Sequence, residues 1–188
     1  QNMRHSTASV KDAVLQAIEE IQKGQERKDG LSGVASGYPG IDRMTYGWQA
    51  SDLIILAARP AVGKTAFVLT MARNMAVDYH IHVAIFSLEM AKTQLIKRIL
   101  VSETGIASDK IWGARKFDGE KEWENFYDRI RRLTDAPMWI DDTPSLSISE
   151  FRSKARRLVH NEGVQMIIID YLQLMTGPPE LRGMREQE

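Results

Sequence analysis

Cysteine is absent from this chain of 188 residues. Its absence excludes disulfide bonds, thiolate metal sites and a cysteine nucleophile, and it fits a reducing cytoplasm. Long apolar runs are also missing, because the longest, residues 53–58, is far shorter than the roughly 18 residues that span a bilayer. No stretch has the charged start, apolar middle and small-residue exit of a signal peptide. We therefore expect a cytoplasmic protein with no membrane partner.

An excess of charge of either sign is missing too, since 25 basic residues balance 25 acidic ones. Bulk charge thus gives no indication of nucleic acid, and any DNA-binding groups must be concentrated locally. Hydrophobic residues make up 43% of the chain and charged residues 27%, which is close to the globular average. This composition excludes a disordered or fibrous chain, and the length predicts one domain with an appendage.

The appendage is the N-terminal part of the chain. Residues 1–9 are polar and aperiodic, which is typical of a flexible lead-in. Residues 10–23 have apolar side chains at helical spacing, and the pattern predicts an amphipathic helix. These side chains are Val10, Val14, Ala17, Ile18 and Ile21. A glycine-rich, charged loop follows over residues 24–37. The apolar stripe needs a cover, either its own domain or a neighbouring subunit, and the pattern leaves both open.

From residue 52 onward, strand and helix patterns alternate. Short apolar runs predict buried strands at residues 53–57, 82–87, 138–140 and 166–169. Helical patterns cover residues 63–77, 91–103, 120–134 and 147–163, and residues 105–118 are irregular. Ser147 and Glu150 have the spacing of a capping box at the start of the last helix. The alternation predicts an α/β domain with a mainly parallel sheet flanked by helices.

A phosphate-binding loop lies between the first strand and its helix. Gly63 allows backbone N–H groups to curl around phosphate oxygens, Lys64 supplies a positive charge, and Thr65 offers a hydroxyl to Mg²⁺. The N-terminus of the following helix points its partial positive charge at the same anion. The position between strand and helix disfavours the alternative, a surface turn with a lysine. The predicted nucleotide-binding residues are Ala58, Arg59, Pro60, Ala61, Val62, Gly63, Lys64, Thr65 and Ala66.

Two acidic residues follow predicted strands at the edge where parallel sheets bind ligands. Asp170 ends the strand of residues 166–169, and we expect it to bind Mg²⁺ together with Thr65. Glu89 follows the strand of residues 82–87, and we expect it to act as the general base for water, with Lys64 as the second catalytic residue. The alternative for either acid is an ordinary loop carboxylate.

Other polar residues carry weaker signals. Asp141 and Asp142 also end a strand, but Thr143 and Pro144 turn the chain there, so we interpret the two acids as turn and cap residues rather than site residues. His80 and His82 lack a carboxylate partner in the sequence, which favours surface positions over a metal site.

Five ordered segments resemble DnaB-type replicative DNA helicases: residues 37–48, 57–67, 86–95, 140–144 and 169–175. The resemblance implies a RecA-like P-loop ATPase domain over residues 37–188, preceded over residues 1–36 by the lead-in, a linker helix and a loop. It also implies ATP and Mg²⁺ as ligands, a homohexameric ring on single-stranded DNA at the replication fork, and primase and a helicase loader as partners. In this family Ala58 commonly replaces the first glycine of the loop, and the linker helix packs on the adjacent subunit.

The resemblance further implies that an N-terminal helical domain is missing before residue 1, and that strands, the arginine finger and most DNA contacts lie beyond Glu188. Arg182 and Arg185 are candidate DNA-contacting residues. Two alternatives stay open. One is another RecA-like DNA-dependent ATPase, a recombinase or repair mediator, and the other is a nucleotide-binding interaction module without catalysis.

Overall fold

The computed structural model describes residues 9–26 and 30–175. The chain divides into two units, with the boundary between Leu53 and Ile54. Within the described residues, no helix is long and apolar enough to cross a membrane.

The first unit begins with helix α1, Val10–Glu26. Ser9 starts it, because the Ser9 hydroxyl accepts from the backbone N–H of Asp12 and donates to the Asp12 carboxylate. The helix passes through Gly24, so the predicted end at residue 23 is wrong by one turn. Its predicted apolar stripe is exposed, with Val10, Val14 and Ile18 all at least 46% accessible. Among residues 9–26 and 30–175, nothing covers this stripe.

The glycine-rich loop leads into the short helix α2, Pro39–Thr45. Val34 and Trp48 form an isolated antiparallel bridge on either side of this helix. Gly33 and Gly47 make the approach possible, because a Cβ atom at either position would collide with the backbone of the facing segment. The buried Asp42 carboxylate accepts a 2.7 Å hydrogen bond from the backbone N–H of Ser36 and closes the turn.

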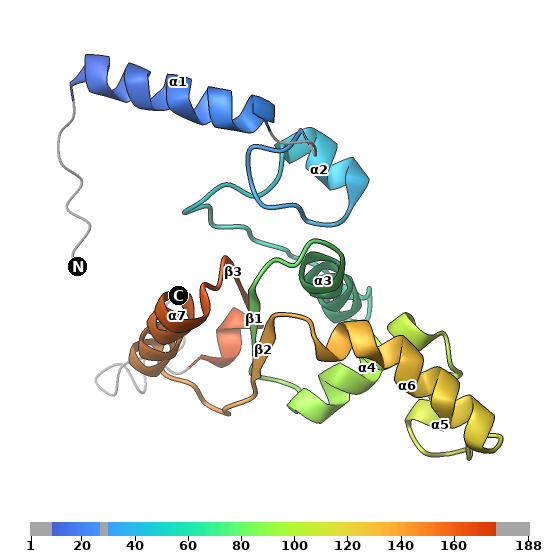
Figure 1. Ribbon diagram of the computed structural model, residues 1–188. Coiled ribbons are helices and arrows are strands. Elements are labelled where there is room, and N and C mark those ends of the chain that lie inside the picture. Colours follow the sequence, from blue (N-terminus) through green and yellow to red (C-terminus); the bar gives the residue numbers. More distant parts are fainter. Residues whose placement is uncertain (1–8, 27–29, 176–188) are drawn as a thin grey trace. The chain divides into compact units, whose positions relative to one another are not determined.

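The second unit contains a parallel sheet in the order β2-β1-β3 (Figure 1). The strands are β1, Val83–Ser87, β2, Met138–Asp141, and β3, Met166–Asp170. The helices and turns around them are α3, Lys64–Arg73; η1, Asn74–Asp78; α4, Lys92–Thr104; α5, Ser108–Ile111; α6, Glu120–Thr134; α7, Ile148–Glu162; and η2, Leu172–Leu174. The predicted α/β arrangement with a parallel sheet is confirmed, and α6 has the predicted bounds. The short α5 lies within the segment expected to be irregular.

Both faces of the sheet are covered. Ala84 and Phe86 of β1 share one hydrophobic cluster with Phe151 and Leu158 of α7. Side chains alternate along a strand, so the buried Val83 and Ile85 point to the opposite face. Figure 1 shows α7 on one side of the sheet and α3 and α4 on the other. This layering places the carboxyl ends of the strands beside the start of α3.

The predicted strand at residues 53–57 is wrong. No strand is assigned there, and the side chains of Leu53, Ile54, Ile55 and Leu56 are 86%, 40%, 80% and 43% exposed. Exposure that alternates from one residue to the next is typical of an extended chain. None of the described strands, however, pairs with this segment. An apolar run becomes a strand only when another strand supplies the hydrogen bonds of a ladder.

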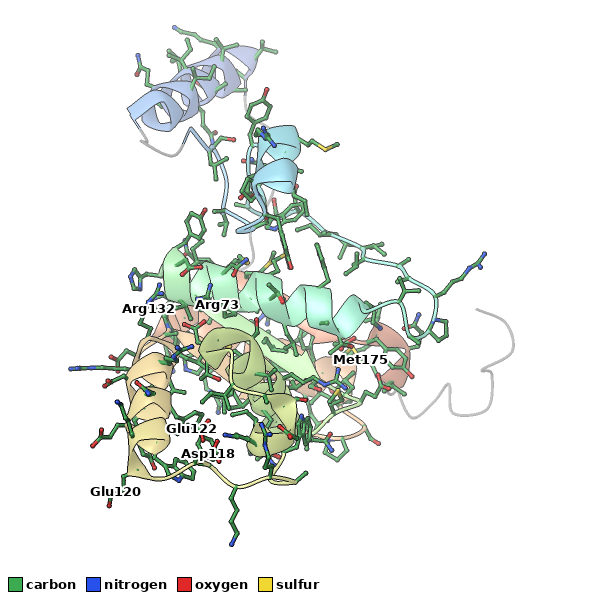
Figure 2. The ribbon with its side chains drawn as sticks, turned by 90° about the vertical axis from the view of Figure 1, so that its right-hand side faces the viewer. Arg73, Asp118, Glu120, Glu122, Arg132 and Met175 are labelled. Carbon is green, nitrogen blue, oxygen red and sulfur yellow. The ribbon has the colours of Figure 1, made fainter. Side chains whose placement is uncertain are left out.

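Ion pairs connect the helices on the α3 side of the sheet (Figure 2). Arg73 of α3 contacts Glu103 of α4 and Asp78 of η1, and Arg132 of α6 reaches the same Asp78 carboxylate at 2.8 Å. Lys110 of α5 forms a second cluster, with the carboxylates of Asp118 and Glu122.

Candidate functional site

The loop before α3 surrounds a cavity of about 610 Å³. Gly63 precedes the helix with a φ of 102°, a left-handed conformation that favours glycine, and Lys64 is the first helical residue. Eight of the nine predicted nucleotide-binding residues line the cavity, namely residues 58–61 and 63–66. Val62, the ninth, is exposed and does not line it. The loop thus places its backbone and the N-terminus of α3 around one cavity, which suits an anion.

Asp170 joins this loop to the end of β3. The Thr65 hydroxyl donates a 2.8 Å hydrogen bond to Oδ2 of Asp170, and Nζ of Lys64 lies 3.1 Å from Oδ1. Nζ of Lys64 also lies 4.4 Å from the centroid of the Tyr171 ring. Asp170 is buried, so its charge depends on these partners. Three of the predicted site residues therefore form one interacting group.

Glu89 lines the same cavity. It lies in the turn after β1, which Ser87 closes. The Ser87 hydroxyl donates to the carbonyl of Met90 at 2.7 Å and accepts from its N–H at 3.2 Å. The backbone N–H of Leu88 donates to the carbonyl of Asp170 at 2.9 Å, which joins this turn to the end of β3. The two acids predicted from separate strands thus come to the same edge of the sheet.

Asp141 and Asp142 have the predicted turn and cap roles. Oδ2 of Asp142 accepts a 2.9 Å hydrogen bond from the first backbone N–H of α4, at Lys92, and this bond lowers the pKa of Asp142. Burial raises the pKa of Asp141, but hydrogen bonds from Lys154 and Thr143 outweigh it and the pKa is lowered. Neither residue lines the cavity.

Among the described residues, His80 and His82 belong to no cluster of metal-ligating side chains. His82 contacts the carbonyl of Glu162, and its ring is tilted against that of Trp139, with the two centroids 5.5 Å apart. No group of three metal-ligating side chains is found among residues 9–26 and 30–175. The candidate DNA-contacting residues Arg182 and Arg185 lie outside the described residues.

Sequence reasoning missed three residues that line the cavity, Arg98, Tyr171 and Gln173. Tyr171 and Gln173 come shortly after Asp170, the last residue of β3. This place in the sequence could have predicted that they line the cavity. Arg98 lies on α4 and is exposed. No local pattern distinguishes it from an arginine on a solvated helix face.

The oxygen atoms at this edge fit Mg²⁺. Thr65 and Asp170 present a hydroxyl and a carboxylate 2.8 Å apart, and hard oxygen ligands of this kind are what Mg²⁺ prefers. The pair supplies one or two ligands, which matches the way Mg²⁺ binds with phosphates and water completing its shell.

Comparison with known proteins places the chain in a family. The profile of the DnaB-like helicase C terminal domain matches residues 33–188. The chain is 41% identical over 187 residues to the replicative DNA helicase DnaB of Geobacillus stearothermophilus, covering 98% of this chain and 41% of that protein. It is also 41% identical over 180 residues to the replicative DNA helicase DnaC of Bacillus subtilis (strain 168), covering 96% and 39%.

Solved structures agree. The ATPase domain of G40P matches with a TM-score of 0.80 and 35% identity, over 91% of this chain and 60% of that one. A DnaB-like replicative helicase, described with its interactions with primase, matches with a TM-score of 0.78 and 34% identity, over 89% and 41%. The chain spans about two fifths of the length of the first two helicases. With a parallel sheet, a phosphate loop and this similarity, the chain belongs to the DnaB-like helicase C-terminal domain family.

Proposed function

We propose that this chain is the motor domain of a replicative DNA helicase, which hydrolyses ATP to move on single-stranded DNA and unwind duplex DNA at the replication fork. One observation carries the proposal. Lys64 and Thr65 of the phosphate loop both contact Asp170, in a cavity that Glu89 also lines. Phosphoryl transfer needs this set, namely a phosphate cradle, ligands for a metal ion and a group that orients water.

Each residue has a distinct role in this proposal. The backbone of residues 58–66 and the N-terminus of α3 bind the phosphates, and Lys64 places its ammonium group against them. Thr65 and Asp170 would hold Mg²⁺, which neutralises charge on the phosphate oxygens when it is bound. Glu89 accepts a proton from the attacking water, because its carboxylate lines the cavity and Lys64 pairs with Asp170 instead.

Assembly into a homohexameric ring is part of the proposal. The exposed apolar stripe of α1 supports it, since Val10, Val14 and Ile18 need a cover and an adjacent subunit offers one. Single-stranded DNA would pass through the ring, with Arg182 and Arg185 as candidate contacts. Primase is a proposed partner because one similar helicase is described with its interactions with primase. A helicase loader and a cytoplasmic location complete the proposal.

Nucleotide binding and DNA unwinding test the proposal in sequence. The chain should bind ATP in the presence of Mg²⁺, and the protein assembled as a ring should unwind a forked duplex while it hydrolyses ATP. Strand exchange without unwinding would favour the recombinase instead. Binding of ATP with no hydrolysis, and no effect of Glu89→Gln, would favour the interaction module. The family assignment favours the helicase over both.

A further inference from the structure

Tyr171 lines the nucleotide cavity, but none of the proposed roles uses it. Its ring lies beside the ammonium group of Lys64, with Nζ 4.4 Å from the ring centroid. The same ammonium group lies 3.1 Å from Oδ1 of Asp170. Two adjacent residues at the end of β3 therefore hold Lys64, one through its charge and the other through its aromatic face.

The two partners of Lys64 differ in what they leave available. A carboxylate oxygen takes up one of the three N–H donors of an ammonium group, whereas an aromatic face attracts the charge without accepting a strong hydrogen bond. In the proposed function Asp170 also holds Mg²⁺, so a metal ion competes with Lys64 for its oxygens. The contact with Tyr171 is compatible with a bound metal ion, and it leaves donors of Lys64 available to phosphate.

The ring of Tyr171 extends from an anchored backbone. Tyr171 directly follows β3 and is the N-cap of η2, and its carbonyl accepts a 3.2 Å hydrogen bond from the N–H of Leu174. The carbonyl of Asp170 accepts from the N–H of Leu88 at 2.9 Å. Lys64 is the first residue of α3, so its backbone is anchored as well. A lysine whose long side chain is held in this way loses less conformational freedom when it binds phosphate.

We propose that Tyr171 is a positioning residue that holds the ammonium group of Lys64 at the wall of the nucleotide cavity. The ring orders the lysine at the phosphate loop and retains it there when Asp170 binds the metal ion. Tyr171 acts through Lys64, and the alternative is a direct contact of the ring with the nucleotide. This role rests on the proposed function, because it requires a nucleotide in the cavity.

A double-mutant cycle tests this role, because it measures whether the ring acts through Lys64. The cycle compares Tyr171→Leu, Lys64→Ala and the double variant with the wild type in the full chain. The affinity for a non-hydrolysable ATP analogue is measured with Mg²⁺ by titration calorimetry. Tyr171→Leu should weaken binding by about fivefold, the scale of a partly exposed cation–π contact. The same substitution in the Lys64→Ala background should change the affinity by less than about twofold.

Further variants examine the chemistry of the ring. Tyr171→Phe should bind the analogue within about twofold of the wild type, because phenylalanine keeps the aromatic face and loses only the hydroxyl. Tyr79→Leu removes an exposed tyrosine that does not line the cavity, and it should bind as the wild type does. Circular dichroism of each variant checks the fold, and Tyr171→Met replaces the leucine variant in the cycle should that variant unfold.

Other outcomes separate this role from the proposed function. An equal loss of affinity from Tyr171→Leu in both backgrounds would show that the ring contacts the nucleotide directly or shapes the cavity, and the positioning role fails alone. The role also fails alone if Tyr171→Phe binds as weakly as Tyr171→Leu, or if Tyr171→Leu binds as tightly as the wild type. If the wild type does not bind the analogue, the proposed function and the positioning role both fail.

Discussion

The hydroxyl of Thr65 donates a 2.8 Å hydrogen bond to the carboxylate of Asp170, a residue 105 positions later in the chain. Thr65 is the second residue of α3, and Asp170 is the last residue of β3. Their contact joins the phosphate loop to the end of a sheet strand. Because Lys64 binds the other oxygen of the same carboxylate, the three side chains are held together by the protein alone. These contacts therefore fix the position of the Asp170 carboxylate at the phosphate loop.

Replacing Lys64 by alanine should weaken nucleotide binding and leave the fold intact. The lysine is partly exposed, and Asp170 keeps its hydrogen bond from Thr65 when the ammonium group is lost. The affinity for ATP should fall by about tenfold or more, because a charge-assisted contact to phosphate disappears. Titration calorimetry measures the affinity, and thermal unfolding followed by circular dichroism checks the fold. Equal ATP affinity in wild type and variant would exclude this loop as the phosphate site.

Replacing Asp170 by asparagine should weaken binding in a way that depends on Mg²⁺. Asparagine keeps an oxygen that accepts from Thr65 but loses the negative charge that the metal ion requires. We expect ATP affinity in excess Mg²⁺ to fall by about tenfold or more, and ATP affinity in EDTA to change little. Asp128→Asn on the exposed face of α6 is the matched control. A loss of the same size with and without Mg²⁺ would argue for a structural role of Asp170.

Replacing Glu89 by glutamine should separate binding from hydrolysis. The amide retains the size and the hydrogen-bonding capacity of the side chain but cannot accept a proton. ATP affinity should stay within about twofold of wild type, while the rate of hydrolysis by the ring-forming protein falls by about 10²-fold or more. Glu120→Gln on α6, away from the cavity, is the control. Hydrolysis at the wild-type rate would show that Glu89 is not the general base.

Features that depend on neighbouring residues in the sequence were predictable. Ser147 and Glu150 form the predicted capping box, with bonds in both directions, and α7 ends at Gly163 in a left-handed conformation. The bounds of α6 followed from helical spacing, and Glu89 and Asp170 followed from the rule that parallel strands end at one edge of a sheet. In each case the cause lies within a few residues or within a general property of the fold.

Features that depend on distant partners were not predictable. The run at residues 53–57 has the composition of a buried strand, but composition does not supply a neighbouring strand. The four residues of α5 are too few to show a helical period, and Lys110 on it is buried because two carboxylates further along the chain surround it. Arg98 has the same local pattern as any exposed helix arginine, and the packing of α4 alone brings it to the cavity.

The cluster of Lys110 with Asp118 and Glu122 should make stability depend on pH at both extremes. The Lys110 side chain is 5% exposed, and its ammonium group lies 2.7 Å from Asp118 and 2.6 Å from Glu122. Hydrogen bonds to Asp118 and then Glu122 raise the pKa of Lys110 above 10.5. The same contacts lower the pKa of Asp118 below 3.8 and that of Glu122 below 4.5.

The two shifts have opposite signs and act in different pH ranges. The carboxylates bind protons more weakly when folded, so their contribution is present above their unfolded pKa values and is lost as the pH falls below about 4. The lysine binds its proton more tightly when folded, so its contribution is complete below pH 10.5 and is lost as the pH rises above that value. Between about pH 5 and 10 the cluster should contribute fully.

Lys110→Met, compared with Lys116→Met on the exposed loop nearby, tests this cluster. Thermal unfolding from pH 3 to 11 should show a Tm several degrees lower for Lys110→Met near pH 7, and a smaller fall of Tm at both extremes, because the two shifts vanish with the ammonium group. Lys116→Met should follow the wild type. Glu122→Gln should lower the Tm more than Asp118→Asn, because the Glu122 side chain is 26% exposed whereas that of Asp118 is 82% exposed and screened by water. An unchanged pH profile in Lys110→Met would show that the cluster does not link folding to protonation.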